Sequence, residues 1–302
     1  MIITQDRSTI NTLLVLVVWF GILSTGNTTE LPQDKEDINQ SFVSFQVFSE
    51  TPQDTKLIQI LEETQTYHRI KKIIETNFIL EKPVRLHIQH PKEAQLIATE
   101  LSQQSYVVVL PFSFLHALYQ GLSNKYEHQR SAIDTIFSTT VEFYIWSEFA
   151  GYLIKEKNLE IKGQPYTTKD NFAAIMLLNQ NNANSDFIAD ASEAYLLIHN
   201  AGESNVSQHM QNELQRDQQR YRHIICLTMG FNQAVQQADI ERDHLESFSW
   251  DESEIEQCKK SYLIVLSNWY EAIETSLQEN NIIQTLSITR LFRSFQSQTE
   301  KF

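Results

Sequence analysis

The spacing of apolar residues changes along the chain, and the change predicts where strands give way to helices. Residues Thr55–Asn77 carry apolar side chains three and four positions apart, which is typical of an amphipathic helix. Apolar and polar residues alternate in 83–90, and a β-branched run in 106–110 ends at Pro111. Both patterns are typical of strands. We therefore expect a helix followed by two strands in the first part of the chain.

From residue 112 onward, the apolar spacing is almost wholly helical. Residues 131–156 form one long apolar helix or a pair of helices, and further helices are expected at 112–122, 170–178, 186–199, 208–229 and 254–277. Gly230 is expected to end the 208–229 helix, since glycine commonly follows a helix C-terminus. The pattern predicts an α+β fold, in which a small N-terminal mixed sheet packs on the 131–156 helix and a mainly helical half follows.

The first 26 residues are predicted to be a signal peptide. Arg7 precedes the apolar run Leu13–Leu23, and small residues follow at 24–26. The run is shorter than the ~20 residues of a membrane-spanning helix, whereas a charged start, an apolar middle and a small-residue end are typical of a secretory signal. Because Asp6 offsets Arg7, an uncleaved anchor is the alternative, and only then would a membrane be a partner. We expect an exported protein, either periplasmic or secreted.

Residues 27–54 are polar and contain Pro32 and Pro52, so they are predicted to form a linker or a loosely attached strand. The remaining residues, 55–300, are long enough to bury a core of their own. We expect them to form a single domain, with the sheet in about 55–130 and the helical part in about 131–300.

Composition adds two constraints. The formal net charge is −14, which argues against a nucleic-acid partner because a phosphate-binding surface needs a basic face. Cys226 and Cys258 are the two cysteines of the chain, and in an oxidising compartment an even pair most simply forms one disulfide. Two buried free thiols are the alternative. His223 and Cys226 have a metal-like spacing, but a single pair of this kind is weak evidence for a metal site.

One stretch of the helical part carries candidate chemistry. Residues 143–178 (FYIWSEFAGYLIKEKNLEIKGQPYTTKDNFAAIMLL) place Glu148 on an apolar helix and Asp170 in the first turns of a second helix, with a loop around Gly163 between them. A zinc peptidase site needs two histidines four positions apart on one helix, and then a third ligand from a later element. The stretch has this layout but contains no histidine.

Residues 143–153 (FYIWSEFAGYL) are similar to the active-site helix of a family of bacterial exported zinc metallopeptidases, which runs Phe-x-x-x-His-Glu-Leu-Gly-His-Ala-Leu. The resemblance continues in 216–230 and 258–273, where the two cysteines of that family match Cys226 and Cys258. It covers about residues 80–275. It implies a zincin-like fold and supports the disulfide.

The resemblance assigns a role to each position of the stretch. Ser147 and Gly151 stand where the family has its two histidine ligands, and Tyr166 stands at its glutamate ligand. Glu148 keeps the position of the general base, and Asp170 keeps the position of a carboxylate that supports a ligand. Catalytic zinc needs three protein ligands, and none of the three remains. We therefore expect no zinc and no other cofactor.

The function that follows is that of a metallopeptidase-like pseudoenzyme, an exported module that binds a peptide or a protein in the former substrate cleft. An active metal-dependent hydrolase with a non-standard ligand set is the first alternative. A helical exported interaction domain unrelated to peptidases is the second.

Two side chains allow expectations about contacts. Glu148 has apolar neighbours on nearly all sides of its helix, so it is expected to be buried and to need a partner, either as a functional residue or as a structural relic. Asp170 is expected to accept a hydrogen bond from Ser147 or Tyr166 in place of the lost imidazole. The alternative is that Asp170 compensates the positive end of its own helix.

Overall fold

The computed structural model describes residues 42–90, 105–127, 129–161, 165–180, 188–194, 208–235 and 250–277, and only the backbone of 165–166, 208–217, 233–235 and 275. Residues 1–41 lie outside this part. The signal peptide predicted for 1–26 therefore stays a prediction. Of the helix predicted for 186–199, the described residues 188–194 are helical.

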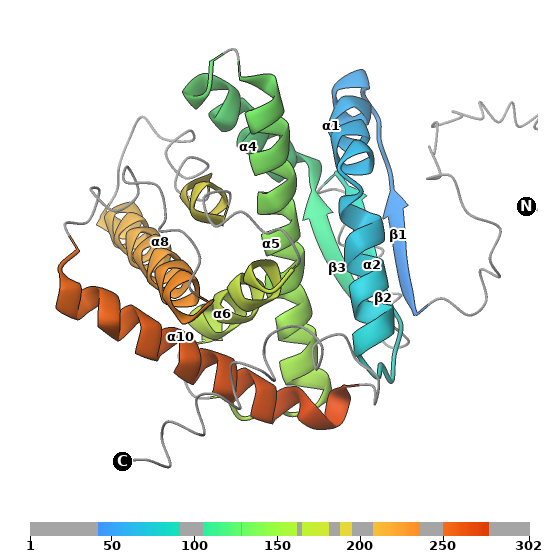
Figure 1. The fold of residues 1–302 in the computed structure, drawn as a ribbon. Helices are drawn as coiled ribbons and strands as arrows, with labels where there is room; N and C mark the ends of the chain where they lie inside the picture. The colour runs from blue at the N-terminus through green and yellow to red at the C-terminus, as the bar shows by residue number, and fades with distance from the viewer. Residues whose placement is uncertain are drawn as a thin grey trace, which may run out of the picture.

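Three short strands form one parallel sheet (Figure 1). They are β1 (Val43–Val47), β2 (Val84–Gln89) and β3 (Tyr106–Pro111), hydrogen-bonded in the order β1-β2-β3. All neighbours are parallel, so the prediction of a mixed sheet is wrong. The chain from β1 to β2 passes through two helices, which return it to the same end of the sheet before the next strand begins, and parallel pairing follows from such a crossover.

β1 lies inside the segment predicted as a linker. The linker prediction for 27–54 is wrong for residues 43–47, where the alternative of a strand holds. Only Val43 and Val47 of this strand are buried, and Gln46 is exposed. A short strand at the edge of a sheet has too few buried positions to produce a recognisable apolar alternation.

Two helices, not one, connect β1 to β2. They are α1 (Pro52–Glu63) and α2 (Thr66–Asn77). The single helix predicted for 55–77 breaks at Gln65, whose φ of 53° is left-handed. Next to it, the hydroxyl of Thr64 donates to the carbonyl of Ile60 at 2.8 Å. A threonine hydroxyl bonded to the preceding turn competes with the helical backbone pattern, and apolar spacing carries no signal of that competition.

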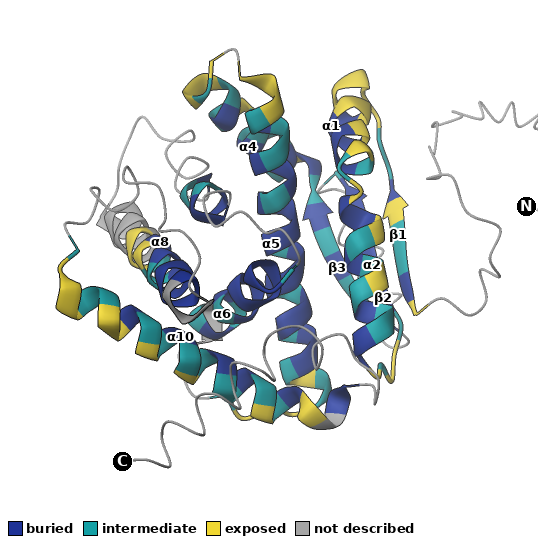
Figure 2. Ribbon diagram, in the orientation of Figure 1, coloured by how far each residue is buried: buried dark blue, intermediate teal, exposed yellow. Residues whose placement is uncertain are grey.

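The helical part is built around α5. Its elements are α4 (Phe112–Lys125), α5 (Arg130–Glu156), α6 (Pro165–Leu178), α8 (Gln208–Val235), α10 (Glu252–Ile273) and the 3₁₀ turn η1 (Glu274–Ser276). Residues 131–156 thus belong to one helix and not to a pair. α5 lies between the sheet and α6, and most of its length is buried (Figures 1 and 2). The fold is α+β and mostly helical, with one small parallel sheet.

The C-terminal end of the described chain returns to the residues that follow α2. Leu277 pairs with Phe78 in an isolated antiparallel bridge, and the N–H of Ile79 donates to the carbonyl of Ser276 at 2.7 Å. One cluster of buried apolar side chains therefore extends from Val43 of β1 to Leu277.

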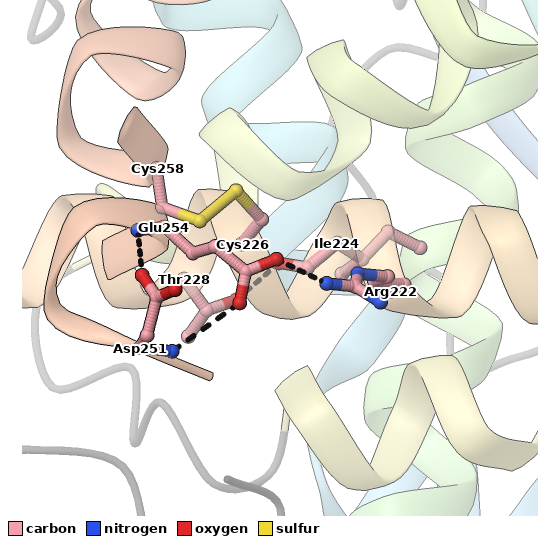
Figure 3. The surroundings of a disulfide bond; sticks show 7 residues. All are labelled: Arg222, Ile224, Cys226, Thr228, Asp251, Glu254 and Cys258. Carbon is pink, nitrogen blue, oxygen red and sulfur yellow. Dashed lines mark hydrogen bonds and ion pairs between the residues drawn. A yellow bond between two sulfur atoms is a disulfide. The ribbon is translucent and has the colours of Figure 1, made fainter. Parts of the chain in front are cut away.

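α8 and α10 pack closely and are joined by the predicted disulfide between Cys226 and Cys258 (Figure 3). α8 does not end at Met229, because it continues through Gly230 to Val235. A Cβ atom at position 230 would lie 2.3 Å from the carbonyl oxygen of Cys258. Gly230 is therefore the residue that lets the backbones of the two helices approach each other, and not a helix end.

The first turn of α10 is held next to the disulfide (Figure 3). Asp251 accepts the backbone N–H of Glu254 at 2.8 Å, and the Glu254 carboxylate accepts the N–H of Asp251 at 3.2 Å. Arg222 of α8 binds Glu254 at 2.7 Å and lies 4.5 Å from the centre of the Trp250 ring. This capping box starts α10 at Glu252, two positions before the helix predicted for 254–277.

We predict that Gly230→Ala destabilises the protein and that Gly151→Ala has a smaller effect. Alanine has the higher helix propensity by ~1 kcal/mol, but at position 230 its methyl group meets a backbone carbonyl, and overpacking of this kind costs ~1–3 kcal/mol. At Gly151 the methyl group meets the end of the Lys169 side chain, 2.8 Å away, and a side chain can move. Urea titrations of both variants give the free energies of unfolding. A Gly230→Ala variant as stable as Gly151→Ala would contradict the prediction.

Candidate functional site

α5 and α6 bring together the residues that the sequence singles out. Ser147 is buried on α5, whereas the side chain of Glu148 is 30% exposed, so the prediction that Glu148 is buried is wrong. Tyr144, Glu148 and Gly151 are all half-buried, and residues four and seven positions apart share one helix face. This face is the side of α5 that its neighbours leave partly open.

Glu148 has a partner that the sequence does not reveal. Lys169, from α6, places its Nζ atom 2.7 Å from Oε1 of Glu148. The same side chain passes over the bare backbone of Gly151. A Cβ atom at position 151 would lie 2.8 Å from Cε and 3.3 Å from Nζ of Lys169. Lys169 therefore fills the space that a side chain at position 151 would need.

Two tyrosines connect this pair to the sheet. The hydroxyl of Tyr106, the first residue of β3, donates to the backbone carbonyl of Glu148 at 3.3 Å. The hydroxyl of Tyr144 donates to the carbonyl of Val109 at 3.2 Å. Burial, and then the negative charge of Glu148, raise the pKa of Tyr106 to about 12. The same two causes raise the pKa of Tyr144 to about 12. At neutral pH both tyrosines are hydrogen-bond donors and not phenolate ligands.

Asp170 is held by an arginine from α8. Nε of Arg220 lies 2.7 Å from Oδ2 of Asp170, and its Nη2 atom lies 3.0 Å from Oδ1. The expected contact with Ser147 is present, but at 3.5 Å it is long. The helix predicted for 170–178 begins at Pro165, so Asp170 lies beyond its first turn. Tyr166 is in that first turn, and its side chain lies outside the described part.

The next residue of α6 also binds α8. Nε2 of His223 lies 2.5 Å from the amide oxygen of Asn171, so Nε2 is the donor. Burial lowers the pKa of His223 and outweighs the opposite effect of the Asp170 charge. Because Cys226 is in the disulfide, it cannot join His223 as a metal ligand. Neutral His223 and Arg220 thus bind two consecutive residues of α6.

A second polar cluster lies at the carboxyl ends of the strands. Asp54 of α1 is fully buried, and its two oxygens bind Nε2 of His90 at 3.1 Å and Nε2 of His116 at 2.7 Å. The backbone N–H groups of Glu50 and Thr51 also donate to Asp54. Burial alone would raise the pKa of Asp54, but the hydrogen bonds from His116, His90 and the two N–H groups outweigh it and hold the pKa well below its usual value. The spacing of the two histidines in the sequence does not predict this convergence.

The residues of the α5–α6 site do not fit a zinc ion. Ser147 contacts Asp170, Gly151 has no side chain, and both carboxylates are paired with cations. Within the described ranges, no group of three or more histidine, cysteine, aspartate or glutamate side chains could hold a metal ion. Nor is any helix in the described part of the chain long and apolar enough to cross a membrane.

Residues 47–273 match a protein family described as "Putative metallopeptidase", and the chain belongs to this family. The match includes both helices of the site, strands β2 and β3 and the disulfide, and it begins at the last residue of β1. No curated protein and no solved structure matches the chain. Membership in the family contradicts the second alternative, that of a helical domain unrelated to peptidases.

We predict that Asp54→Asn lowers stability and that the loss shrinks in acid. Since the folded state holds the pKa of Asp54 below its ordinary value of 3.8, the charge stabilises the fold above about pH 4, and this contribution disappears as pH falls through the folded pKa. Hydrogen bonds to a charged group contribute ~1.5–3 kcal/mol.

The measurement is the difference in free energy of unfolding between wild type and Asp54→Asn, from urea titrations at pH 5 and pH 2. Glu50→Gln, at an exposed carboxylate next to the same cluster, is the control and should show a much smaller difference. A difference for Asp54→Asn that is the same at both pH values would contradict the prediction.

Proposed function

We propose that this member of the metallopeptidase family has lost zinc binding and peptidase activity and acts as an exported module that binds a peptide or protein segment beside β3 and α5. The observation that carries the proposal is the position of Lys169, whose ammonium group lies 2.7 Å from the carboxylate at the general-base position and 3.3 Å from where a side chain at position 151 would begin. A positive charge at this place opposes the binding of a Zn²⁺ ion by electrostatic repulsion.

Loss of the metal removes the chemistry as well. In a zinc peptidase, the ion lowers the pKa of its bound water, and a glutamate takes up the proton. Glu148 stands in the general-base position, but it is engaged by Lys169, and no metal-binding group of side chains lies beside it among the described residues. A carboxylate alone does not produce a strong enough nucleophile at neutral pH.

The outer edge of β3 supports peptide binding. The N–H of Tyr106 donates to Pro83 next to β2, so in a parallel pair the N–H groups of Val107 and Val109 point away from β2. Within the described part of the chain, neither group has a backbone partner. Free N–H groups on an edge strand accept an extended peptide as an additional strand. The carbonyl of Val109 already accepts a hydrogen bond from the Tyr144 hydroxyl, so the backbone of Val107 would contribute most to pairing with a peptide.

The disulfide supports export. Cys226 and Cys258 form a bond that persists in oxidising compartments and is rare in the cytosol. A periplasmic or secreted location agrees with it and with the predicted signal peptide.

We expect the purified protein to hold no stoichiometric zinc after incubation with excess ZnSO₄ and dialysis, measured by inductively coupled plasma mass spectrometry. It should also leave a mixture of unstructured peptides uncleaved when the products are analysed by mass spectrometry. One zinc per chain that is lost in Glu148→Ala and in Asp170→Ala would instead support the active hydrolase with a non-standard ligand set.

We also expect the protein to select extended sequences from a displayed random-peptide library. N-methylation of alternate amides in a selected peptide should weaken binding at least tenfold in one register and leave it nearly unchanged in the other, because only every second amide of an added strand faces β3. Isothermal titration calorimetry with the two methylated peptides measures this. Equal affinities in the two registers, or no selected peptide at all, would refute binding at the strand edge.

A further inference from the structure

Lys169 is partly buried between two helices, unlike most surface lysines. Its ammonium group lies between two helices, bonded to Glu148 of α5, and its side chain is 28% exposed. Glu148 is its only hydrogen-bond partner among the described residues. An ammonium group carries three N–H donors, so two of them remain for a ligand.

We propose that Lys169 is a built-in cation that replaces the metal ion of this site: it excludes divalent metals and offers its N–H donors to a carbonyl or carboxylate oxygen of the bound peptide. The inference rests on the proposed function, because it concerns the same site and the same class of ligand. Beyond the proposed function, it names Lys169 as the residue that keeps metal ions out. It also names the group on the peptide that Lys169 binds, a carbonyl or carboxylate oxygen.

The exclusion has a steric part. With a Cβ atom at position 151 only 2.8 Å from Cε of Lys169, any residue larger than glycine at that position must displace the lysine. A histidine at position 151 carries a ring beyond its Cβ atom and so needs more space than that atom alone. The glycine at 151 and the lysine at 169 are therefore complementary, and restoring the histidine alone does not restore the site.

The exclusion also has an electrostatic part. The ammonium group neutralises Glu148, and Arg220 neutralises Asp170, so neither carboxylate is left with an unbalanced charge to attract a metal ion. A divalent ion next to the ammonium group would be repelled, and the repulsion is strong at short range in a partly buried site. The lysine thus supplies the positive charge that a zinc ion would otherwise bring, without an open coordination position.

The metal arm of the test compares two reconstructed proteins. The first carries Ser147→His, Gly151→His and Tyr166→Glu with Lys169 retained, and the second carries the same three changes together with Lys169→Ala. After incubation with ZnSO₄ and dialysis, we expect close to one zinc per chain in the second and at least tenfold less in the first. Circular dichroism and the melting temperature check that both are folded. Equal zinc contents in the two folded proteins, whether both near zero or both near one, would overturn the inference.

The ligand arm uses a peptide selected from the displayed library. Lys169→Met should weaken its binding at least tenfold, whereas Lys169→Arg, which keeps a positive donor, should weaken it less than threefold. Lys155→Met, at an exposed lysine one turn beyond Gly151, is the matched control and should have no effect. Unchanged affinity in Lys169→Met would overturn the ligand role of Lys169. Failure of the wild type to bind any peptide would refute the proposed function itself, and the zinc comparison would still test the exclusion.

Discussion

The burial of α5 is the constraint on which the rest of the structure depends. Helix α5 is covered by the sheet, α1, α2, α4 and α6, and its apolar side chains form the centre of the main core cluster. Burial of this extent also takes in Glu142, whose side chain is 2% exposed. Its carboxylate binds Arg69 of α2, Nε1 of Trp146 at 3.3 Å and Nε2 of Gln180 at 2.6 Å. Because a buried carboxylate must be compensated, this one residue connects α2 to the residues just after α6.

The candidate site is the part of α5 that this burial leaves half open. There the charges are balanced between helices: Lys169 binds Glu148, and Arg220 binds Asp170. In a metal site the ion and its histidines provide that balance. Here two basic side chains provide it. Each carboxylate of the site is thus paired with a basic side chain from a neighbouring helix.

Elements with strong local patterns could be predicted from the sequence. β2 and β3 alternate or form short β-branched runs, α5 is apolar over its length, and the two cysteines pair as expected. Elements that depend on packing could not. β1 has two buried residues, and its place in the sheet comes from pairing with β2. Gly230 follows an apolar helical run, which is the usual position of a glycine that ends a helix. Its actual role is to leave space for the carbonyl oxygen of Cys258 on α10.

That positions 147 and 151 carry no imidazole is a property of residue identity, since they are a serine and a glycine and neither offers the side chain that zinc binds. It holds in any fold and needs no coordinates. The basic side chains that pair with the two carboxylates could not be identified from the sequence in this way. In the sequence Lys169 is a polar residue beside Asp170 with no distinguishing neighbour, and Arg220 is one arginine among several. Only the packing of α6 against α5, and of α8 against α6, brings these two side chains to the carboxylates, because a contact between residues of different helices is set by three-dimensional distance and not by spacing along the chain.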